Sequence, residues 1–212
     1  MNPILEKIQK TGIIPIIIIH DTKDAESLGN ALIGGGIACA EITFRTDAAK
    51  ESIRILKEKF PDMLVGAGTV LTTQQVDHAI EVGAEFIVSP GFNSKVVAYC
   101  KEKGIVVIPG CSNASDIEMA IEYGIEVVKF FPAEQSGGLK LIKALSAPYG
   151  NIKFMATGGI NESNVREYLE CDKIIACGGS WMANELSIRA HEFEKIKGLT
   201  KECAEIVKEV RG

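Results

Sequence analysis

The stretch that decides the fold is AIEYGIEVVKFF, residues 120–131. Its first half is typical of the end of an amphipathic helix closed by glycine, the residue that most readily adopts the left-handed conformation found there. Its second half is a short, nearly continuous apolar run, as expected of a parallel strand buried on both faces. The stretch therefore predicts a helix, a tight turn and a buried strand, in that order.

The same unit recurs along the chain. The segments ALIGGG (31–36), AIEVG (79–83) and CKEKG (100–104) each precede another short run of strand-forming residues. Eight such runs start about 20 to 27 residues apart, which leaves room for one helix and two turns between strands. The predicted strands are Pro15–Ile19, Ala38–Phe44, Leu64–Ala67, Phe86–Ser89, Val106–Pro109, Glu126–Phe131, Lys153–Ala156 and Lys173–Cys177.

Two local signals support helices between and after these strands. Thr72 with Gln75 is typical of a capping box at a helix N-terminus. Near the C-terminus, apolar residues follow helical spacing at Ile196, Leu199, Cys203, Ile206 and Val210. Eight βα units without a break in composition predict one domain over residues 1–212, an α/β fold consisting of a single (β/α)8 TIM barrel with an N-terminal helix.

A doubly wound open sheet is the alternative that the same alternation allows. In that fold a glycine-rich dinucleotide loop follows a strand, whereas the glycines at 34–36 precede one. Gly66-Ala67-Gly68 does follow a predicted strand, but it lacks the third glycine of the motif. The dinucleotide-binding interpretation is therefore the weaker one.

Composition excludes several classes of partner. The chain has 23 Lys and Arg against 28 Asp and Glu, a net charge of −5, which argues against nucleic acid or an anionic membrane as partner. The longest apolar run, residues 13–19, is too short to span a bilayer, and the charges within residues 1–10 are unlike a signal peptide. Six cysteines without a Cys-x-x-Cys pair predict reduced thiols in the cytoplasm.

Lys129 stands inside the apolar run of residues 127–131. Alternation places it on the same face of the strand as Val127 and Phe131. One interpretation is a lysine that extends to solvent or pairs with an acid. The other is a buried amine, because burial disfavours the charged form of an amine and a neutral amine can attack a ketone to form a Schiff base. A position near the C-terminal end of a barrel strand favours the second.

The second predicted strand carries two charged residues on one face, Glu41 and Arg45. Residues four apart on a strand are separated by about 13 Å, so an ion pair between them would need both side chains stretched toward each other. Separate roles are the preferred interpretation. Glu41 would act as an acid or base deep in the barrel, and Arg45 would clamp a carboxylate at its mouth.

Two glycine-rich segments follow the last two strands: Thr157-Gly158-Gly159 and Gly178-Gly179-Ser180. Glycine lets backbone N–H groups approach an anion, and the loops after strands seven and eight are the habitual phosphate site of a TIM barrel. The alternative is that these glycines only make tight turns. Taken together, the two segments predict a phosphate site.

The remaining candidates are weaker. His20 ends the first strand, but no second histidine or carboxylate cluster accompanies it, so no metal site is expected. Cys111 and Cys177 lie near strand ends without a paired base, which argues against a reactive thiol. Trp181 is interpreted as a packing residue beside the second glycine segment.

Several motifs span the chain: GIIPI (12–16), EITFRT (41–46), GAGTVL (66–71), SPG (89–91), IPG (108–110), KFFPAE (129–134), TGGI (157–160) and GGSW (178–181). Through them the chain resembles the 2-keto-3-deoxy-6-phosphogluconate (KDPG) / 4-hydroxy-2-oxoglutarate (KHG) aldolase family, class I aldolases with a trimeric (β/α)8 architecture. The resemblance implies a homotrimer that needs no cofactor. It also implies cleavage of KDPG to pyruvate and glyceraldehyde 3-phosphate, a step of Entner–Doudoroff carbohydrate metabolism, and/or of 4-hydroxy-2-oxoglutarate to pyruvate and glyoxylate.

The resemblance also implies residue roles. Lys129 would be the Schiff-base lysine and Glu41 the proton shuttle, with Arg45 and Thr69 holding the pyruvyl carboxylate. The pocket and phosphate site would be formed by Pro90, Phe131, Thr157, Gly158, Gly159, Gly179 and Ser180.

The chain departs from the family pattern at His20-Asp21, where relatives often carry a lysine or arginine, and this leaves the preference between the two substrates open. The segment Cys111-Ser112-Asn113 is a second departure, with no predicted effect. Two other functions stay open: another phosphate-binding TIM-barrel enzyme, such as an isomerase or decarboxylase of sugar phosphates, and a non-catalytic binder of phosphate ligands.

Overall fold

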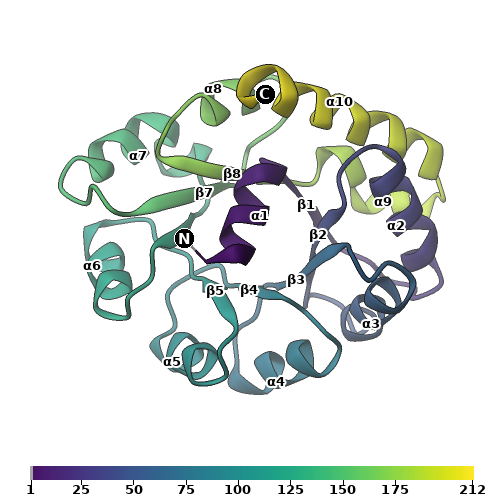
Figure 1. The fold of residues 1–212 in the computed structure, drawn as a ribbon, viewed down its shortest axis with the longest axis horizontal. Coiled ribbons are helices and arrows are strands. Elements are labelled where there is room, and N and C mark those ends of the chain that lie inside the picture. The colour runs from purple at the N-terminus through teal and green to yellow at the C-terminus, as the bar shows by residue number, and fades with distance from the viewer. Residues whose placement is uncertain (1) are drawn as a thin grey trace.

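The computed structural model describes residues 2–212 and shows parallel strands arranged as a barrel with helices around it (Figure 1). The strand order is β5-β4-β3-β2-β1-β8-β7-β6, and every pair of neighbours in it is parallel. The strands are β1 (Ile13–Ile17), β2 (Cys39–Thr43), β3 (Leu64–Gly68), β4 (Phe86–Val88), β5 (Val106–Ile108), β6 (Val127–Phe130), β7 (Lys153–Thr157) and β8 (Ile174–Gly179).

Helices alternate with the strands and cover the outside of the barrel (Figure 1). The α-helices are α1 (Pro3–Thr11), α2 (Asp24–Gly34), α3 (Ala49–Lys59), α4 (Thr73–Glu81), α5 (Ser94–Glu102), α6 (Ala114–Glu122), α7 (Gly138–Ser146), α8 (Val165–Leu169), α9 (Glu185–Arg189) and α10 (Phe193–Arg211). Short 3₁₀ turns, η1 (Glu134–Ser136) and η2 (Trp181–Ala183), follow β6 and β8. The predicted (β/α)8 barrel is confirmed.

Most strand positions agree with the sequence-based prediction, but β1 begins two residues earlier, at Ile13. Proline is expected at the start of a strand because it lacks an N–H, yet here the strand continues through Pro15. The reason is tertiary: β8 pairs with residues 13–15, aligning Ile13 with Cys177 and Pro15 with Gly179.

Within residues 2–212, the barrel closes between β5 and β6 at one isolated bridge, between Gly110 and Lys129. Two backbone hydrogen bonds make this closure. Lys129 N donates to the Pro109 carbonyl at 2.8 Å, and Cys111 N donates to the Lys129 carbonyl at 2.8 Å. The backbone of Lys129 therefore forms the joint that completes the ring of strands.

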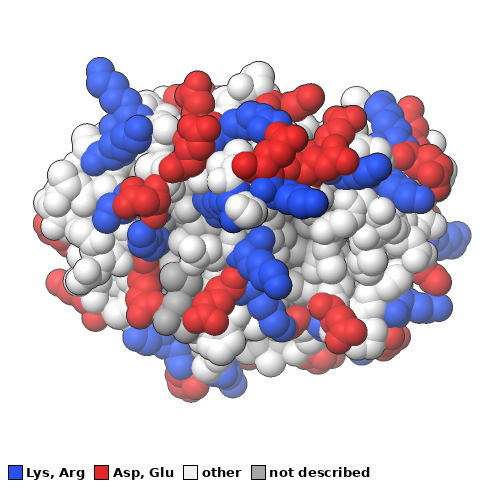
Figure 2. All heavy atoms as spheres, turned by 45° about the horizontal axis from the view of Figure 1, so that its top comes forward, with Lys and Arg blue, Asp and Glu red and all other residues white. Residues whose placement is uncertain are grey.

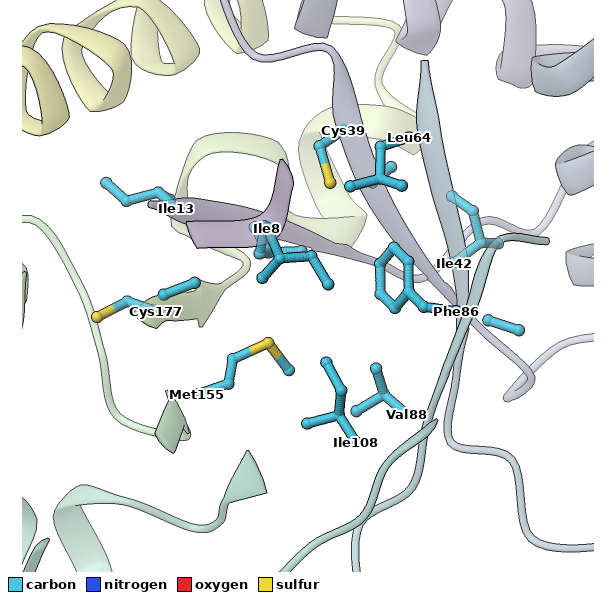
Figure 3. Close-up of a cluster of buried hydrophobic side chains, with 14 of the residues drawn as sticks. Ile8, Ile13, Cys39, Ile42, Leu64, Phe86, Val88, Ile108, Met155 and Cys177 are labelled. Carbon is cyan, nitrogen blue, oxygen red and sulfur yellow. The ribbon is translucent and has the colours of Figure 1, made fainter. Parts of the chain in front are cut away.

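The helix α1 lies across one end of the barrel and closes it (Figure 1). Figure 3 shows Ile8 of this helix near the middle of a ring of side chains from the strands, among them Phe86 and Met155, whereas the Cys177 sulfur points away from it. All four side chains are fully buried. Burial of apolar surface contributes about 25 cal/mol per Å². The packing of α1 therefore stabilises the end of the barrel at which the strands begin.

Two local predictions are confirmed. Thr72 and Gln75 form the capping box of α4, with Gln75 N donating to Thr72 Oγ1 at 3.2 Å. The C-terminal pattern forms α10, which buries Ile196, Cys203 and Ile206 against the barrel.

Charged side chains of both signs are interspersed on the face drawn in Figure 2, unlike a concentrated basic surface. Among residues 2–212, none of the helices combines the length and apolarity that crossing a bilayer requires.

Candidate active site

Lys129 and Glu41 face each other inside the barrel. They come from β6 and β2, and Lys129 Nζ lies 3.5 Å from Glu41 Oε1. Glu41 is fully buried, and Lys129 exposes only 6% of its surface to solvent. The lysine amine also lies 5.2 Å from the centre of the Phe131 ring, over its face. An amine and a carboxyl group thus share one apolar site near the strand ends.

This arrangement excludes a lysine that extends to solvent, and it agrees both with a lysine paired with an acid and with a buried amine. Lys129 does not extend to solvent; it is buried, and an acid is beside it. Glu41 pairs with Lys129 and not with Arg45, whose Nε donates instead to Thr69 Oγ1 at 3.3 Å. Glu41 Oε2 is buried and has no hydrogen-bond partner, so one carboxyl oxygen stays available for proton transfer.

Gly68 makes room for the Glu41 carboxyl group. It is the last residue of β3, aligned with Thr43 of β2. A Cβ atom at position 68 would lie 2.2 Å from Glu41 Oε1 and 2.8 Å from its Cδ, far inside van der Waals contact. In the sequence, Gly68 stands out only as part of a weak dinucleotide motif and of the GAGTVL segment, and neither predicts this role. The signal that could have revealed this role is the place of Gly68 directly after the third predicted strand, next to the strand that carries Glu41.

Arg45 and Thr69 lie just beyond the ends of β2 and β3, at the mouth of the barrel. Arg45 is exposed, so its guanidinium is accessible to a carboxylate. Thr69 has φ of +55°, a left-handed conformation that is costly for a threonine. Backbone strain of this kind is concentrated at functional sites, which favours a role for Thr69. Pro90 is partly exposed two residues beyond β4.

The two glycine segments follow adjacent strands, β7 and β8. Gly158 and Gly159 have φ of +98° and +77°, so a side chain at either position would be strained. Thr157 Oγ1 is buried without a hydrogen-bond partner. A Cβ atom added to Gly178 of β8 would lie 2.6 Å from Thr157 Oγ1, so the Thr157 hydroxyl group points toward β8.

Gly179 ends β8 and the exposed Ser180 follows it. The ring of Trp181 packs on Gly179, since a Cβ atom added to Gly179 would lie 1.8 Å from the ring. Trp181 is thus a packing residue beside the second glycine segment, as predicted.

The cysteines near the strand ends are poor candidates for nucleophiles. Burial raises the pKa of the Cys111 thiol to about 12, and the charge of Asp116 adds to the rise. Burial likewise raises the pKa of Cys177 to about 12. At neutral pH both stay protonated, and the thiol is a far weaker nucleophile than the thiolate.

A large hollow of about 930 Å³ lies at the opposite end of the barrel, between α1 and α10. It is lined by the segments that lead into β2 and β3, away from the strand exits, and charges of both signs line it, such as Lys208 and Asp62. We place no chemistry there. Within residues 2–212, no three side chains of His, Cys, Asp or Glu gather as metal ligands would.

Comparison with known proteins shows the family of this chain. A family model described as KDPG and KHG aldolase matches residues 4–199. The chain belongs to this family. It is 45% identical over 207 residues to the 2-dehydro-3-deoxy-phosphogluconate aldolase of Treponema pallidum, covering 98% of this chain and 99% of the relative. The enzyme of the same name from Haemophilus influenzae is 44% identical, covering 97% of each chain.

A solved structure shows the same likeness in three dimensions. The KDPG aldolase of Legionella pneumophila superimposes with a TM-score of 0.91 at 36% identity, over 94% of this chain and 97% of that one. That protein was captured with pyruvate at low pH as a covalent carbinolamine intermediate.

The departure from the KDPG and KHG aldolase pattern at His20-Asp21 has a structural counterpart. His20 Nε2 lies 2.8 Å from Glu185 Oε1, which joins the exit of β1 to α9, the helix that follows the Gly179-Ser180 segment. Asp21 accepts a hydrogen bond from Lys23 N at 3.0 Å and so makes a local turn. At the position of this departure the chain therefore presents a histidine bound to an acid.

Proposed function

We propose that this protein is a class I aldolase that forms a Schiff base between Lys129 and a 2-keto acid and releases pyruvate. The observation that carries the proposal is the buried Lys129 amine 3.5 Å from the buried Glu41 carboxyl group, in a chain that belongs to the KDPG and KHG aldolase family. The carbinolamine of the Legionella pneumophila relative supports covalent catalysis of this type.

The reaction begins with attack of Lys129 Nζ on the C2 ketone and loss of water, which leaves a protonated imine. Glu41 removes the proton of the C4 hydroxyl group, and the C3–C4 bond breaks. Its electron pair moves toward the imine, so an aldehyde leaves and an enamine remains on Lys129. Glu41 then returns its proton to C3, and hydrolysis of the imine frees pyruvate and the lysine.

The other residues bind the substrate. Arg45 and Thr69, joined by their 3.3 Å hydrogen bond, hold the pyruvyl carboxylate at the mouth. Two further groups of residues contact the rest of the substrate. Pro90, Phe131 and Thr157 line the pocket, and backbone N–H groups of Gly158, Gly159, Gly179 and Ser180 receive the phosphate.

The substrates are KDPG, cleaved to pyruvate and glyceraldehyde 3-phosphate, and/or 4-hydroxy-2-oxoglutarate, cleaved to pyruvate and glyoxylate. The names of the two bacterial relatives support the phosphorylated one, whereas the His20–Glu185 pair adds no free cation to the phosphate end. Comparing kcat/KM for the two substrates measures the preference. We further propose one catalytic domain over residues 1–212, a homotrimer and a cytoplasmic location; six free thiols are consistent with a reducing compartment.

Borohydride trapping tests the function directly. Incubation with pyruvate and borohydride should add one reduced pyruvyl group at Lys129, detected by peptide mass spectrometry. The Lys129→Ala variant should lose both the adduct and turnover. Saturable ligand binding with no adduct would instead favour a non-catalytic binder, and turnover without an adduct would favour another barrel enzyme in which Lys129 acts only through its charge.

A further inference from the structure

The strand that carries Lys129 is held very differently on its two sides. Toward β7, β6 forms a regular ladder in which Lys129 aligns with Met155. Toward β5, the described residues make one bridge, and both of its hydrogen bonds use the backbone of Lys129. The partners are the Pro109 carbonyl and Cys111 N. The position of Lys129 therefore depends on the short segment 109–111 that follows β5.

A single carboxylate, that of Asp116, binds the two residues that follow this segment, Ser112 and Asn113. Asp116 Oδ2 accepts a hydrogen bond from Ser112 N at 2.9 Å and another from Asn113 Nδ2 at 3.0 Å. The Cys111 thiol donates to the Asp116 carbonyl at 3.5 Å. Asp116 lies in the first turn of α6, so it ties the segment to a helix. Hydrogen bonds to a charged group are stronger than those between neutral groups.

The same segment leaves no room for adjustment on its other side. A Cβ atom added to Gly110 would lie 2.1 Å from the Pro90 carbonyl oxygen and 2.6 Å from Gly91 N. These are backbone atoms, which cannot rotate away as a side chain can. Segment 109–111 is thus packed between the Pro90 turn and the backbone of Lys129.

We propose that Asp116 is a positioning residue for Lys129, acting through Ser112, Cys111 and the closing bridge of the barrel. The proposal rests on the function proposed above. It gives a role to the segment Cys111-Ser112-Asn113, for which the sequence predicted none. Asp116 touches no reacting atom; it sets where the amine stands when it attacks the ketone.

The test compares two neighbouring acids of the same helix. Asp116→Ala removes the carboxylate bonds to Ser112 N and Asn113 Nδ2 and leaves the Cys111 bond to the backbone carbonyl of residue 116. Glu118→Ala removes a bond of similar length, 2.9 Å from Tyr149 Oη, which does not lead to the site. Misplacement of a catalytic group by 1 Å can cost about a hundredfold in rate, so a partial displacement predicts a loss of about tenfold. Asp116→Ala should therefore lower kcat and the rate of borohydride-trapped pyruvate adduct about tenfold, with KM changed much less. Glu118→Ala should match the wild type.

Asp116→Asn provides the rescue, because an amide oxygen can accept both hydrogen bonds without the charge. It should restore most of the trapping rate; a rate as low as that of Asp116→Ala would overturn the hydrogen-bond route. Equal rates for the Asp116→Ala and Glu118→Ala variants would overturn the proposal while leaving the aldolase function intact. Absence of an adduct in the wild-type protein would instead refute the function.

If the Asp116→Ala variant does not fold, the Gly110→Ala variant provides a second test of the proposal. It should slow trapping as well, since its Cβ must move either the Pro90 turn or the bridge to Lys129. Gly198→Ala, in α10 with nothing within 4 Å of the added Cβ, is its control. Wild-type trapping in a folded Gly110→Ala variant would count against the proposal.

Discussion

Replacing Gly68 with alanine should separate the two proposed catalytic groups. The added Cβ would stand 2.2 Å from Glu41 Oε1 and 2.7 Å from Glu41 Cγ. The carboxyl group must recede by about 1 Å to reach ordinary contact distance, and Glu41 is fully buried, so it has little space to move into. It already lies 3.5 Å from Lys129 Nζ, at the limit of a hydrogen bond.

The expected cost divides between stability and rate. Overpacking of a buried site destabilises by about 1–3 kcal/mol, which most domains tolerate. Loss of a positioned general acid–base group, or its displacement by 1 Å, lowers the rate by about 10²-fold or more. We therefore expect a folded Gly68→Ala protein whose kcat falls about a hundredfold. The pyruvate adduct should still form, because Lys129 keeps its place.

Gly66→Ala is the matched control on the same strand. The three atoms nearest to its Cβ all belong to the Phe86 ring, the closest at 2.3 Å, so its main clash is with the core, whereas the main clash at position 68 is with Glu41. Thermal melts and steady-state aldol cleavage, measured on both variants, distinguish general destabilisation from loss of the acid–base group. Wild-type kcat in Gly68→Ala, or an equal fall in Gly66→Ala at equal stability, would refute the assignment of Gly68.

Three further outcomes follow from the site. Glu41→Gln should slow cleavage by about 10²–10⁴-fold while binding of pyruvate is kept; an unchanged rate in a cleavage assay would remove Glu41 from the mechanism. Arg45→Lys should raise KM for the keto acid with a smaller change in kcat, since lysine cannot make a two-pronged contact with a carboxylate; equal KM in the same assay would contradict the clamp. Because burial raises the pKa of Cys177 to about 12, the folded protein keeps this thiol protonated where the unfolded chain, with a thiol pKa near 8.5, ionises. This thiol's contribution to the free energy of unfolding should be fully present below about pH 8 and should then fall by up to about 1.4 kcal/mol per pH unit until about pH 12. Urea melts of Cys177→Ala should lack this decline, and parallel curves for both proteins would contradict the raised pKa.

The sequence alone determined the features that are written locally. Helix, glycine and buried strand recur at a spacing that only a few folds satisfy, and the strand alternation placed Lys129 and Glu41 on definite faces of their strands. Motif chemistry identified the lysine, because an amine inside an apolar strand is rare and costly. These properties depend on neighbours within a few residues, so they can be read without the fold.

Only the tertiary structure decided which groups meet. Glu41 and Lys129 are 88 residues apart, and their 3.5 Å separation depends on the tilt and stagger of the strands between them. The same holds for Gly68, which is needed because of a side chain on the next strand, and for β1, whose start is set by its pairing with β8. Closure of the barrel through the backbone of Lys129 is likewise a property of the assembled ring, since no local pattern states that β5 and β6 will join at a bridge rather than along a regular ladder.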